Sequence, residues 1–79
     1  MEITRIEKVN FVSEVYRQLR QMIVSGTWEE GSKIASENEL AKTFHVSRVV
    51  IREALQMLRT EKLIVTRQGL GSFVANPNN

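Results

Sequence analysis

The fold is decided by residues 36–60, which read SENELAKTFHVSRVVIREALQMLRT. The first four residues have the form of a capping box, in which the Ser36 hydroxyl accepts from the third helical N–H and Glu39 reaches back to the N–H of Ser36. A helix of about two turns is therefore expected to start there and to run to Phe44. Ser47 is a suitable N-cap residue for a second helix over residues 48–60. Only about three residues separate the two helices, which is the connection length of a helix-turn-helix.

Upstream of this pair, the sequence predicts a further helix over residues 11–25. Its apolar residues recur at steps of three and four, which places them on one stripe of a helix. Gly26 follows and suits the left-handed cap that ends a helix. Residues 27–32 contain turn-forming residues and are expected to form a loop, and residues 33–35 are expected to add a very short strand.

Downstream, residues 63–67 and 72–75 favour β-structure and flank a turn that contains two glycines, which predicts a β-hairpin. The expected fold class is mainly α-helical with a small β-hairpin: three helices and a two-stranded wing, a winged helix-turn-helix. We expect residues 1–75 to form this domain. Residues 76–79 are expected to be a C-terminal tail or the start of a linker to a missing effector or dimerisation domain.

Length and composition agree with one small domain, because 79 residues cover only one core. The absence of cysteine excludes disulfides, thiolate metal sites and thiol nucleophiles, and is typical of the reducing cytosol. His45 is the single histidine and glutamate is the only carboxylate type, so neither a metal site, a cofactor site nor a catalytic pair emerges. The longest apolar runs are too short to cross a membrane. These observations favour a cytoplasmic protein that is not an enzyme.

Charge is distributed unevenly along the chain. Residues 1–44 hold six Lys or Arg against seven Glu, whereas residues 45–79 hold five against two. The basic character therefore lies in the C-terminal half, which permits nucleic-acid binding but is weak support for it when taken alone.

The helix predicted over residues 48–60 separates its polar and apolar residues. At roughly 100° per residue, Arg52, Gln56 and Arg59 fall within about 80° of Arg48 on a helical wheel. An adjacent, distinct stripe is apolar and consists of Ile51, Ala54, Leu55 and Leu58. The helix is thus expected to be anchored by one side and to present arginines on another. Such a helix fits the major groove of DNA, where an arginine can donate two hydrogen bonds to guanine.

Further contacts are expected around this helix. The helix starts at Ser36 and Ser47 offer backbone N–H groups and hydroxyls to phosphate oxygens. In the hairpin, Gly69 allows close approach to a sugar-phosphate edge, and Arg67 and Gln68 can reach a phosphate or the minor groove.

A less specific explanation exists for the arginines, which at four-residue spacing most often form a solvated helix face. The capped helix pair and the hairpin favour DNA contact for Arg48 and Arg52 instead. Arg59 is a weaker candidate, because Glu53 or Glu61 could pair with it. The hypothesis would fail if Arg48 and Arg52 pointed inward or were locked against neighbouring glutamates.

From about Val15 to Ala75 the sequence resembles the N-terminal winged helix-turn-helix domain of GntR-family bacterial transcription regulators. The resemblance is carried by Ser25-Gly26, Gly31, Ser36-Glu37, Leu40-Ala41, Val46-Ser47-Arg48, Arg52-Glu53-Ala54-Leu55, Leu58, Leu63-Ile64, Gly69, Gly71 and Phe73-Val74. It implies that the third helix reads the major groove, that the wing contacts the minor groove, and that Ser47, Arg48, Arg52 and Gly69 lie at positions that touch DNA. The run Arg52 to Leu55 looks more like the FadR-type branch than others.

The sequence departs from the family pattern at several positions. His45 and Lys62 stand where the family usually has glycine, and Ile34-Ala35 replaces a Leu-Pro pair. Asn38 lies where many members carry an arginine that touches DNA. Val49 and Val50 replace a Thr-Pro or Thr-Thr pair and could meet a thymine methyl group, so these changes affect the expected base preference.

The resemblance also implies the partners. We expect sequence-specific binding to double-stranded DNA at a palindromic operator, with no membrane partner. A homodimer is expected only for a full-length protein with an effector domain, and the isolated domain is expected to be monomeric. The alternative function is a winged-helix module that binds another protein rather than DNA, because the fold alone does not fix the ligand.

Overall fold

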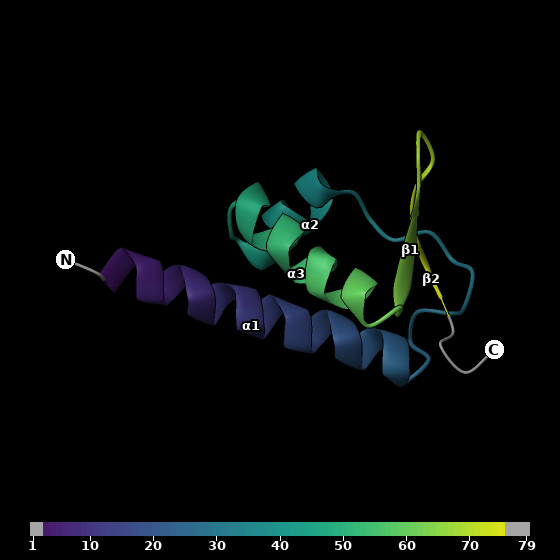
Figure 1. The fold of residues 1–79 in the computed structure, drawn as a ribbon, viewed down its shortest axis with the longest axis horizontal. Coiled ribbons are helices and arrows are strands. Elements are labelled where there is room, and N and C mark those ends of the chain that lie inside the picture. The colour runs from purple at the N-terminus through teal and green to yellow at the C-terminus, as the bar shows by residue number, and fades with distance from the viewer. Residues whose placement is uncertain (1–2, 76–79) are drawn as a thin grey trace.

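Three helices and a hairpin follow one another in the computed structural model, which describes residues 3–75. The elements are α1 (Ile3–Val24), α2 (Glu37–Phe44), α3 (Arg48–Thr60), β1 (Ile64–Arg67) and β2 (Gly71–Val74). Figure 1 shows α3 lying along α1, α2 beside α3, and the hairpin standing away from the C-terminal end of α3. The winged helix-turn-helix fold class is confirmed. The tail expected at residues 76–79 lies outside the described residues.

The first helix begins earlier than its apolar pattern predicts. It starts at Ile3 rather than near residue 11, and it ends at Val24, close to the predicted stop. In the added turns Ile3, Ile6 and Val9 continue the three-residue spacing of the apolar residues, a signal that the prediction did not use, although Val9 is 59% exposed. The added turns also contain neither glycine nor proline, so nothing interrupts the helix. Lys8 of this segment forms an ion pair of 2.8 Å with Glu53 of α3.

The capping box forms as predicted. Ser36 Oγ accepts a hydrogen bond of 3.2 Å from the N–H of Glu39, and Glu39 Oε1 accepts one of 2.9 Å from the N–H of Ser36. The helix α2 ends at His45, whose φ of 58° is left-handed and whose N–H bonds to the carbonyl of Ala41. Ser47 caps α3 by accepting from the N–H of Val50 at 3.2 Å. Two capped helices and a left-handed residue thus build the turn between them.

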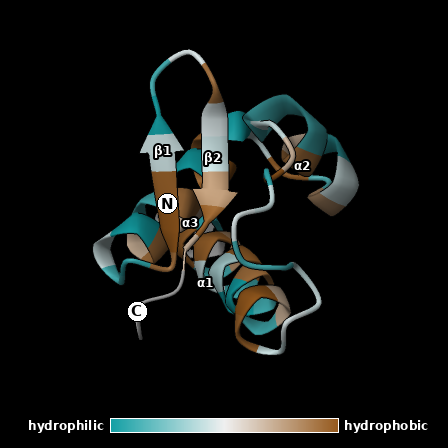
Figure 2. Cartoon of the chain, turned by 90° about the vertical axis from the view of Figure 1, so that its right-hand side faces the viewer, coloured by the Kyte–Doolittle hydropathy of each residue, from teal (hydrophilic) through white to brown (hydrophobic). Residues whose placement is uncertain are grey.

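The wing is an antiparallel pair in which Ile64 lies opposite Val74 and Arg67 lies opposite Gly71. Its turn is closed by the N–H of Leu70, which donates to the carbonyl of Arg67 at 2.9 Å, and Gly69 adopts a φ of +78° there. Figure 2 shows that the strands are hydrophobic at their base, toward the helices, and more polar toward the tip.

The short strand expected at residues 33–35 is reduced to a single bridge. Lys33 pairs with Phe73 of β2, flanked by the bonds from the N–H of Ile34 to the carbonyl of Ser72 and from the N–H of Val74 to the carbonyl of Ser32. The strand does not extend because Ser36 already belongs to the cap of α2. This bridge fixes the loop before α2 against the wing.

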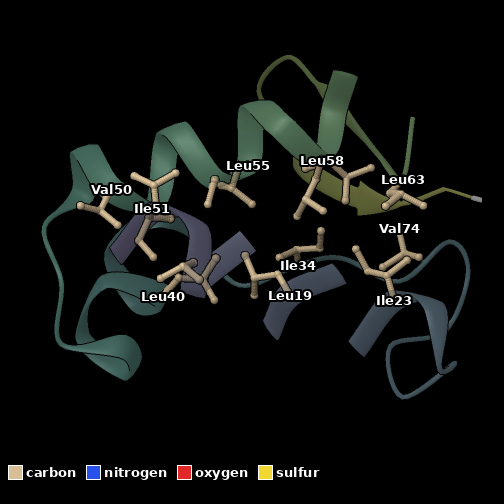
Figure 3. Packing of buried hydrophobic residues seen from close by; sticks show 14 residues of the cluster. Leu19, Ile23, Ile34, Leu40, Val50, Ile51, Leu55, Leu58, Leu63 and Val74 are labelled. Carbon is tan, nitrogen blue, oxygen red and sulfur yellow. The ribbon is translucent and has the colours of Figure 1, made fainter. Parts of the chain in front are cut away.

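The core lies between α1, α3 and the base of the wing (Figure 3). Leu19, Ile51 and Leu58 are its largest fully buried side chains. Trp28 and Tyr16 pack against its edge. Among the described residues no polar or charged side chain is buried, so apolar burial provides most of the stability. None of the helices described is both long enough and apolar enough to span a membrane.

Candidate nucleic-acid interface

The outer face of α3 presents the predicted arginines to solvent. Arg48, Arg52 and Gln56 are exposed, whereas Ile51, Ala54 and Leu58 on the opposite side are completely buried. Neither arginine points inward, because the burial of the apolar stripe against α1 fixes the rotation of the helix. The first two turns of α3 therefore hold two cationic groups directly after the Ser47 cap.

Both arginines also contact α2. Arg48 Nη1 lies 3.5 Å from Asn38 Oδ1, and Arg52 Nη2 lies 3.3 Å from Glu37 Oε1. Arg48 is therefore not held by a glutamate. Arg52 is held by one, Glu37, but only in part. The pair at Arg52 uses one nitrogen, and the Arg52 side chain remains 57% exposed. Exposed ion pairs of this kind contribute little, so the guanidinium can exchange Glu37 for another acceptor.

The two valines after Arg48 have different environments. Val49 is 44% exposed on the outer face, so its predicted contact with DNA stays a prediction. Val50 is only 4% exposed and belongs to the core, so the prediction that its side chain meets a thymine methyl group is wrong. The reason is that α2 packs beside α3. It covers a part of the α3 surface that lies outside the apolar stripe facing α1.

The predicted phosphate donors lie at the helix starts. Ser36, Ser47 and Asn38 are all exposed. Each serine oxygen accepts a backbone N–H within its cap, which leaves its own O–H free to donate to an anion. The caps therefore leave the two serine hydroxyl protons available to a phosphate, but they use the backbone N–H groups of Ser36, Glu39 and Val50.

The wing residues Arg67, Gln68 and Gly69 are exposed at the end of β1 and in the turn. The Arg67 guanidinium carbon lies 6.0 Å from the centre of the Phe73 ring, at the outer limit of a cation–π contact. This contact leaves its hydrogen-bond donors unused. The wing residues are thus positioned apart from the face of α3, on the far side of a groove.

That groove, with a volume of about 410 Å³, separates α3 from the wing. Its lining includes Arg59, the weaker candidate contact, and also Lys33, Thr66 and Ser72, which were not predicted to contact DNA. Lys33 lies close to the wing, since a Cβ on Gly71 would meet Lys33 Cε at 2.8 Å. Lys33 is a long cation beside the candidate DNA surface, and only the bridge between residue 33 and β2 brings it there. No local sequence signal marks it.

The partners of Arg59 differ from those expected. Arg59 contacts Gln56 and Thr66. The two glutamates expected to compete for it are engaged elsewhere: Glu53 pairs with Lys8, and Glu61 lies 3.6 Å from Arg20 Nε. Arg59 therefore joins the outer face of α3 to the wing.

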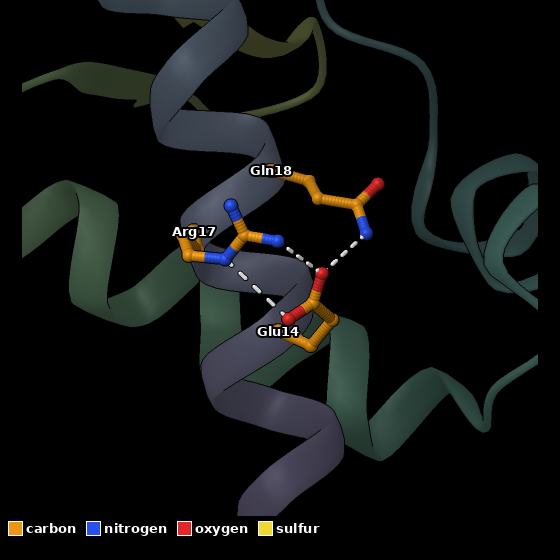
Figure 4. Close-up of polar contacts among 3 residues, drawn as sticks. All are labelled: Glu14, Arg17 and Gln18. Atoms are coloured by element: carbon orange, nitrogen blue, oxygen red, sulfur yellow. Dashed lines mark hydrogen bonds and ion pairs between the residues drawn. The ribbon is translucent and has the colours of Figure 1, made fainter.

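The carboxylate of Glu14 on α1 is engaged within its own helix. Glu14 accepts hydrogen bonds from Arg17 and Gln18 of the same helix (Figure 4), and these bonds lower the pKa of its carboxyl group. The hydrogen bond that Tyr16 donates to Glu61 raises the pKa of the tyrosine.

Within residues 3–75, no group of three potential ligands is arranged to hold a metal ion.

Comparison with known proteins finds similarity to bacterial regulatory proteins. The family model described as bacterial regulatory proteins, gntR family, matches residues 11–74. A histidine utilization repressor of Klebsiella aerogenes is 42% identical over 67 residues, which cover 85% of this chain and 28% of the relative. The Uxu operon regulator of Haemophilus influenzae is 38% identical over 69 residues, which cover 82% of this chain and 26% of the relative. The chain therefore spans little more than a quarter of the length of these relatives.

Solved structures agree. The DNA-binding domain of AraR in complex with operator ORR3 matches with a TM-score of 0.79 and 37% identity, over 82% of this chain and 78% of that one. A GntR family transcriptional regulator from Listeria monocytogenes matches with a TM-score of 0.79 and 28% identity, over 85% of this chain and 59% of that one.

Proposed function

This chain belongs to the gntR family of bacterial regulatory proteins, and from that premise we propose that it binds double-stranded DNA sequence-specifically as the DNA-reading part of a transcriptional regulator. The observation that carries the proposal is the exposed pair Arg48 and Arg52 on the first turns of α3, beside a helix-turn-helix whose opposite face is buried. It assigns the chain no catalytic role.

In this proposal α3 enters the major groove. Arg48 and Arg52 donate to base edges, and Val49 offers an apolar contact to a thymine methyl group. Ser36, Asn38 and Ser47 hold the phosphates at the helix starts, which sets the register on the duplex without reading sequence. Arg67, Gln68 and Gly69 bring the wing to the sugar-phosphate edge or the minor groove.

Relatives guide the finer assignment. The matching proteins include repressors of histidine utilization and of arabinose metabolism, so repression is the proposed output here. These names give no support to the FadR-type branch that the run Arg52 to Leu55 suggested, so the proposal stays at the level of the family. A bacterial regulator that binds the chromosome acts in the cytoplasm.

Assembly follows from the geometry of DNA. Palindromic operators are read by two copies about one helical turn apart. We propose that residues 1–75 are the reading domain of a longer protein that dimerises elsewhere, and that this domain alone is monomeric. Tethering two copies should then tighten binding to a palindrome far more than binding to a half-site. Equal affinities for both sites in both forms would contradict this arrangement.

Selection of duplexes from a random pool, with the chain fused to a dimerising coiled coil, tests the function directly. An enriched motif followed by titration at several salt concentrations should give a log–log slope near −0.9 per phosphate contacted. A chain that binds no duplex even at low salt would favour the alternative, a module that uses the same face to bind a protein.

A further inference from the structure

A set of hydrogen bonds connects the outer face of α3 to the wing. Arg59 donates to Gln56 Oε1 through Nε at 3.3 Å and through Nη2 at 2.9 Å. Its remaining nitrogen, Nη1, donates to Thr66 Oγ1 at 3.1 Å, and that oxygen lies 3.0 Å from Ser72 Oγ. All three nitrogens of the guanidinium are therefore engaged, two by α3 and one by β1.

The chemistry of arginine decides which way the Gln56 amide faces. A guanidinium carries donors and no acceptor, so the Gln56 atom that meets both Nε and Nη2 is the oxygen. Both lone pairs of that oxygen are then in use. The Gln56 amide nitrogen keeps its two donors, and Gln56 itself is exposed. In this setting the side chain can donate to a ligand but has no acceptor left to offer.

This restriction changes what Gln56 can read. A free glutamine reads adenine through both of its polar atoms, because it donates to N7 and accepts from the N6 amino group. A glutamine that only donates cannot satisfy that amino group. Guanine presents two acceptors, N7 and O6, in the same part of the major groove. The two amide hydrogens match these acceptors.

We propose that Arg59 is a positioning residue that holds Gln56 as a pure donor, so that the base pair facing Gln56 is read as guanine in preference to adenine. The inference rests on the proposed function, because it assumes that α3 lies in the major groove. Thr66 contributes by holding the third nitrogen of Arg59 from the wing. Base preference at one position of α3 is thus set by a contact with a different element of the fold.

The test compares motifs selected from random duplexes by the tethered chain and its variants. Gln56→Ala identifies the position that Gln56 reads, since preference should be lost there alone. Arg59→Met keeps the length of the side chain but removes every donor, which frees Gln56 Oε1. The ratio of guanine to adenine at that position should fall by about fivefold or more, while preference elsewhere in the motif is retained.

Three further variants separate this effect from loss of charge or of structure. Arg17→Met removes an equivalent charge from the far side of α1 and should leave the ratio unchanged. Arg59→Lys, which retains a donor, should restore part of the guanine preference. Thr66→Val removes the hydroxyl and keeps the size of the side chain. It should shift the ratio in the same direction as Arg59→Met, but by less, and it serves as the test if Arg59→Met folds poorly.

The outcomes distinguish the two proposals. Selection of no motif by the wild-type chain would overturn the proposed function and this inference with it. A clear motif whose guanine to adenine ratio is the same in Arg59→Met and Thr66→Val would overturn the inference alone. A wild-type preference for adenine at the position identified by Gln56→Ala, or no such position at all, would do the same.

Discussion

The thirteen residues of α3 divide into two faces with different roles. On the inner face Ile51, Ala54 and Leu58 are completely buried against the core, whereas on the outer face the Arg52 side chain is 57% exposed and makes one weak ion pair. The inner face therefore stabilises the fold, and the outer face is available to a ligand. Substitutions on the inner face should therefore lower stability, and those on the outer face should weaken binding, each with little effect on the other quantity. The tests follow in order of expected effect.

The largest effect is expected from Leu58→Ala on the inner face. Removing a fully buried leucine loses burial and leaves a cavity, which should lower the free energy of unfolding by about 2–5 kcal/mol. Urea denaturation followed by circular dichroism measures this change. The neighbouring Met57, 40% exposed, is the matched control, and Met57→Ala should cost under about 1 kcal/mol. Equal losses in both variants would contradict the division between the faces.

Arg52→Ala should have the opposite profile. Loss of a base contact should weaken binding to the selected motif by about 1–3 kcal/mol and relax preference at that position. The free energy of unfolding should change by under about 1 kcal/mol, because the ion pair with Glu37 is exposed. Titration and denaturation of the same sample measure both quantities, with Arg17→Ala on α1 as the control for charge. An unchanged affinity would remove Arg52 from the interface.

Ser36 contributes to stability as the cap of α2, and in the proposed function it also binds a phosphate of DNA. Ser36→Ala removes the acceptor for the N–H of Glu39 and should cost about 1 kcal/mol of stability. Ser36→Asp keeps a good cap but brings a negative charge, so it should retain stability and weaken DNA binding. If both variants bind as the wild type does, Ser36 is a cap and nothing more.

A smaller change is expected at the turn between α2 and α3. His45 has a φ of 58°, a conformation in which a side chain is strained and glycine is not. His45→Gly should relieve this strain but lose entropy on folding, for a net gain of about 0.5 kcal/mol. Thermal unfolding measures it. Lys42→Gly, within the helix, should instead be destabilising, and a destabilised His45→Gly would show that the histidine ring contributes contacts.

The smallest effect concerns pH. The backbone N–H of Ser36, and then its hydroxyl, lower the pKa of Glu39 below its ordinary value. A carboxyl whose pKa is lower in the folded state stabilises the fold above its unfolded pKa of about 4.3, and this contribution is lost as pH falls through the folded pKa. Glu39→Gln should therefore lose less stability than the wild type between pH 6 and 3. Parallel pH profiles for the two proteins would contradict this role of the cap.

Local signals predicted the elements well. The capping box at Ser36, the Ser47 cap and the β-favouring runs around Gly69 each depend on neighbours a few residues apart, so α2, α3 and the wing appear where expected. His45 and Lys62, which replace family glycines, both adopt positive φ, so the backbone keeps the conformation that glycine would favour. The start of α1 was missed because the spacing of Ile3, Ile6 and Val9, which extends the helical pattern toward the N-terminus, was not used.

Features that depend on packing between elements could not be predicted. A wheel for α3 alone places Val50 beside the apolar stripe, and only the neighbouring α2 buries it. The partners of Arg59 also depend on packing between elements, and the nearby glutamates were expected instead. Its actual contact with Thr66 spans seven residues and needs the hairpin to fold back toward α3. Lys33 reached the groove through its bridge to Phe73.

No polar or charged side chain is buried in the described core, so the stability of the fold should depend little on salt concentration. Apolar contacts respond little to dissolved ions at moderate concentrations, whereas the attraction between arginines and phosphates weakens steeply. If the domain binds DNA as proposed, a rise in salt concentration should release it from the duplex while leaving it folded and ready to bind again. Salt concentration would then change the occupancy of the duplex without unfolding the domain.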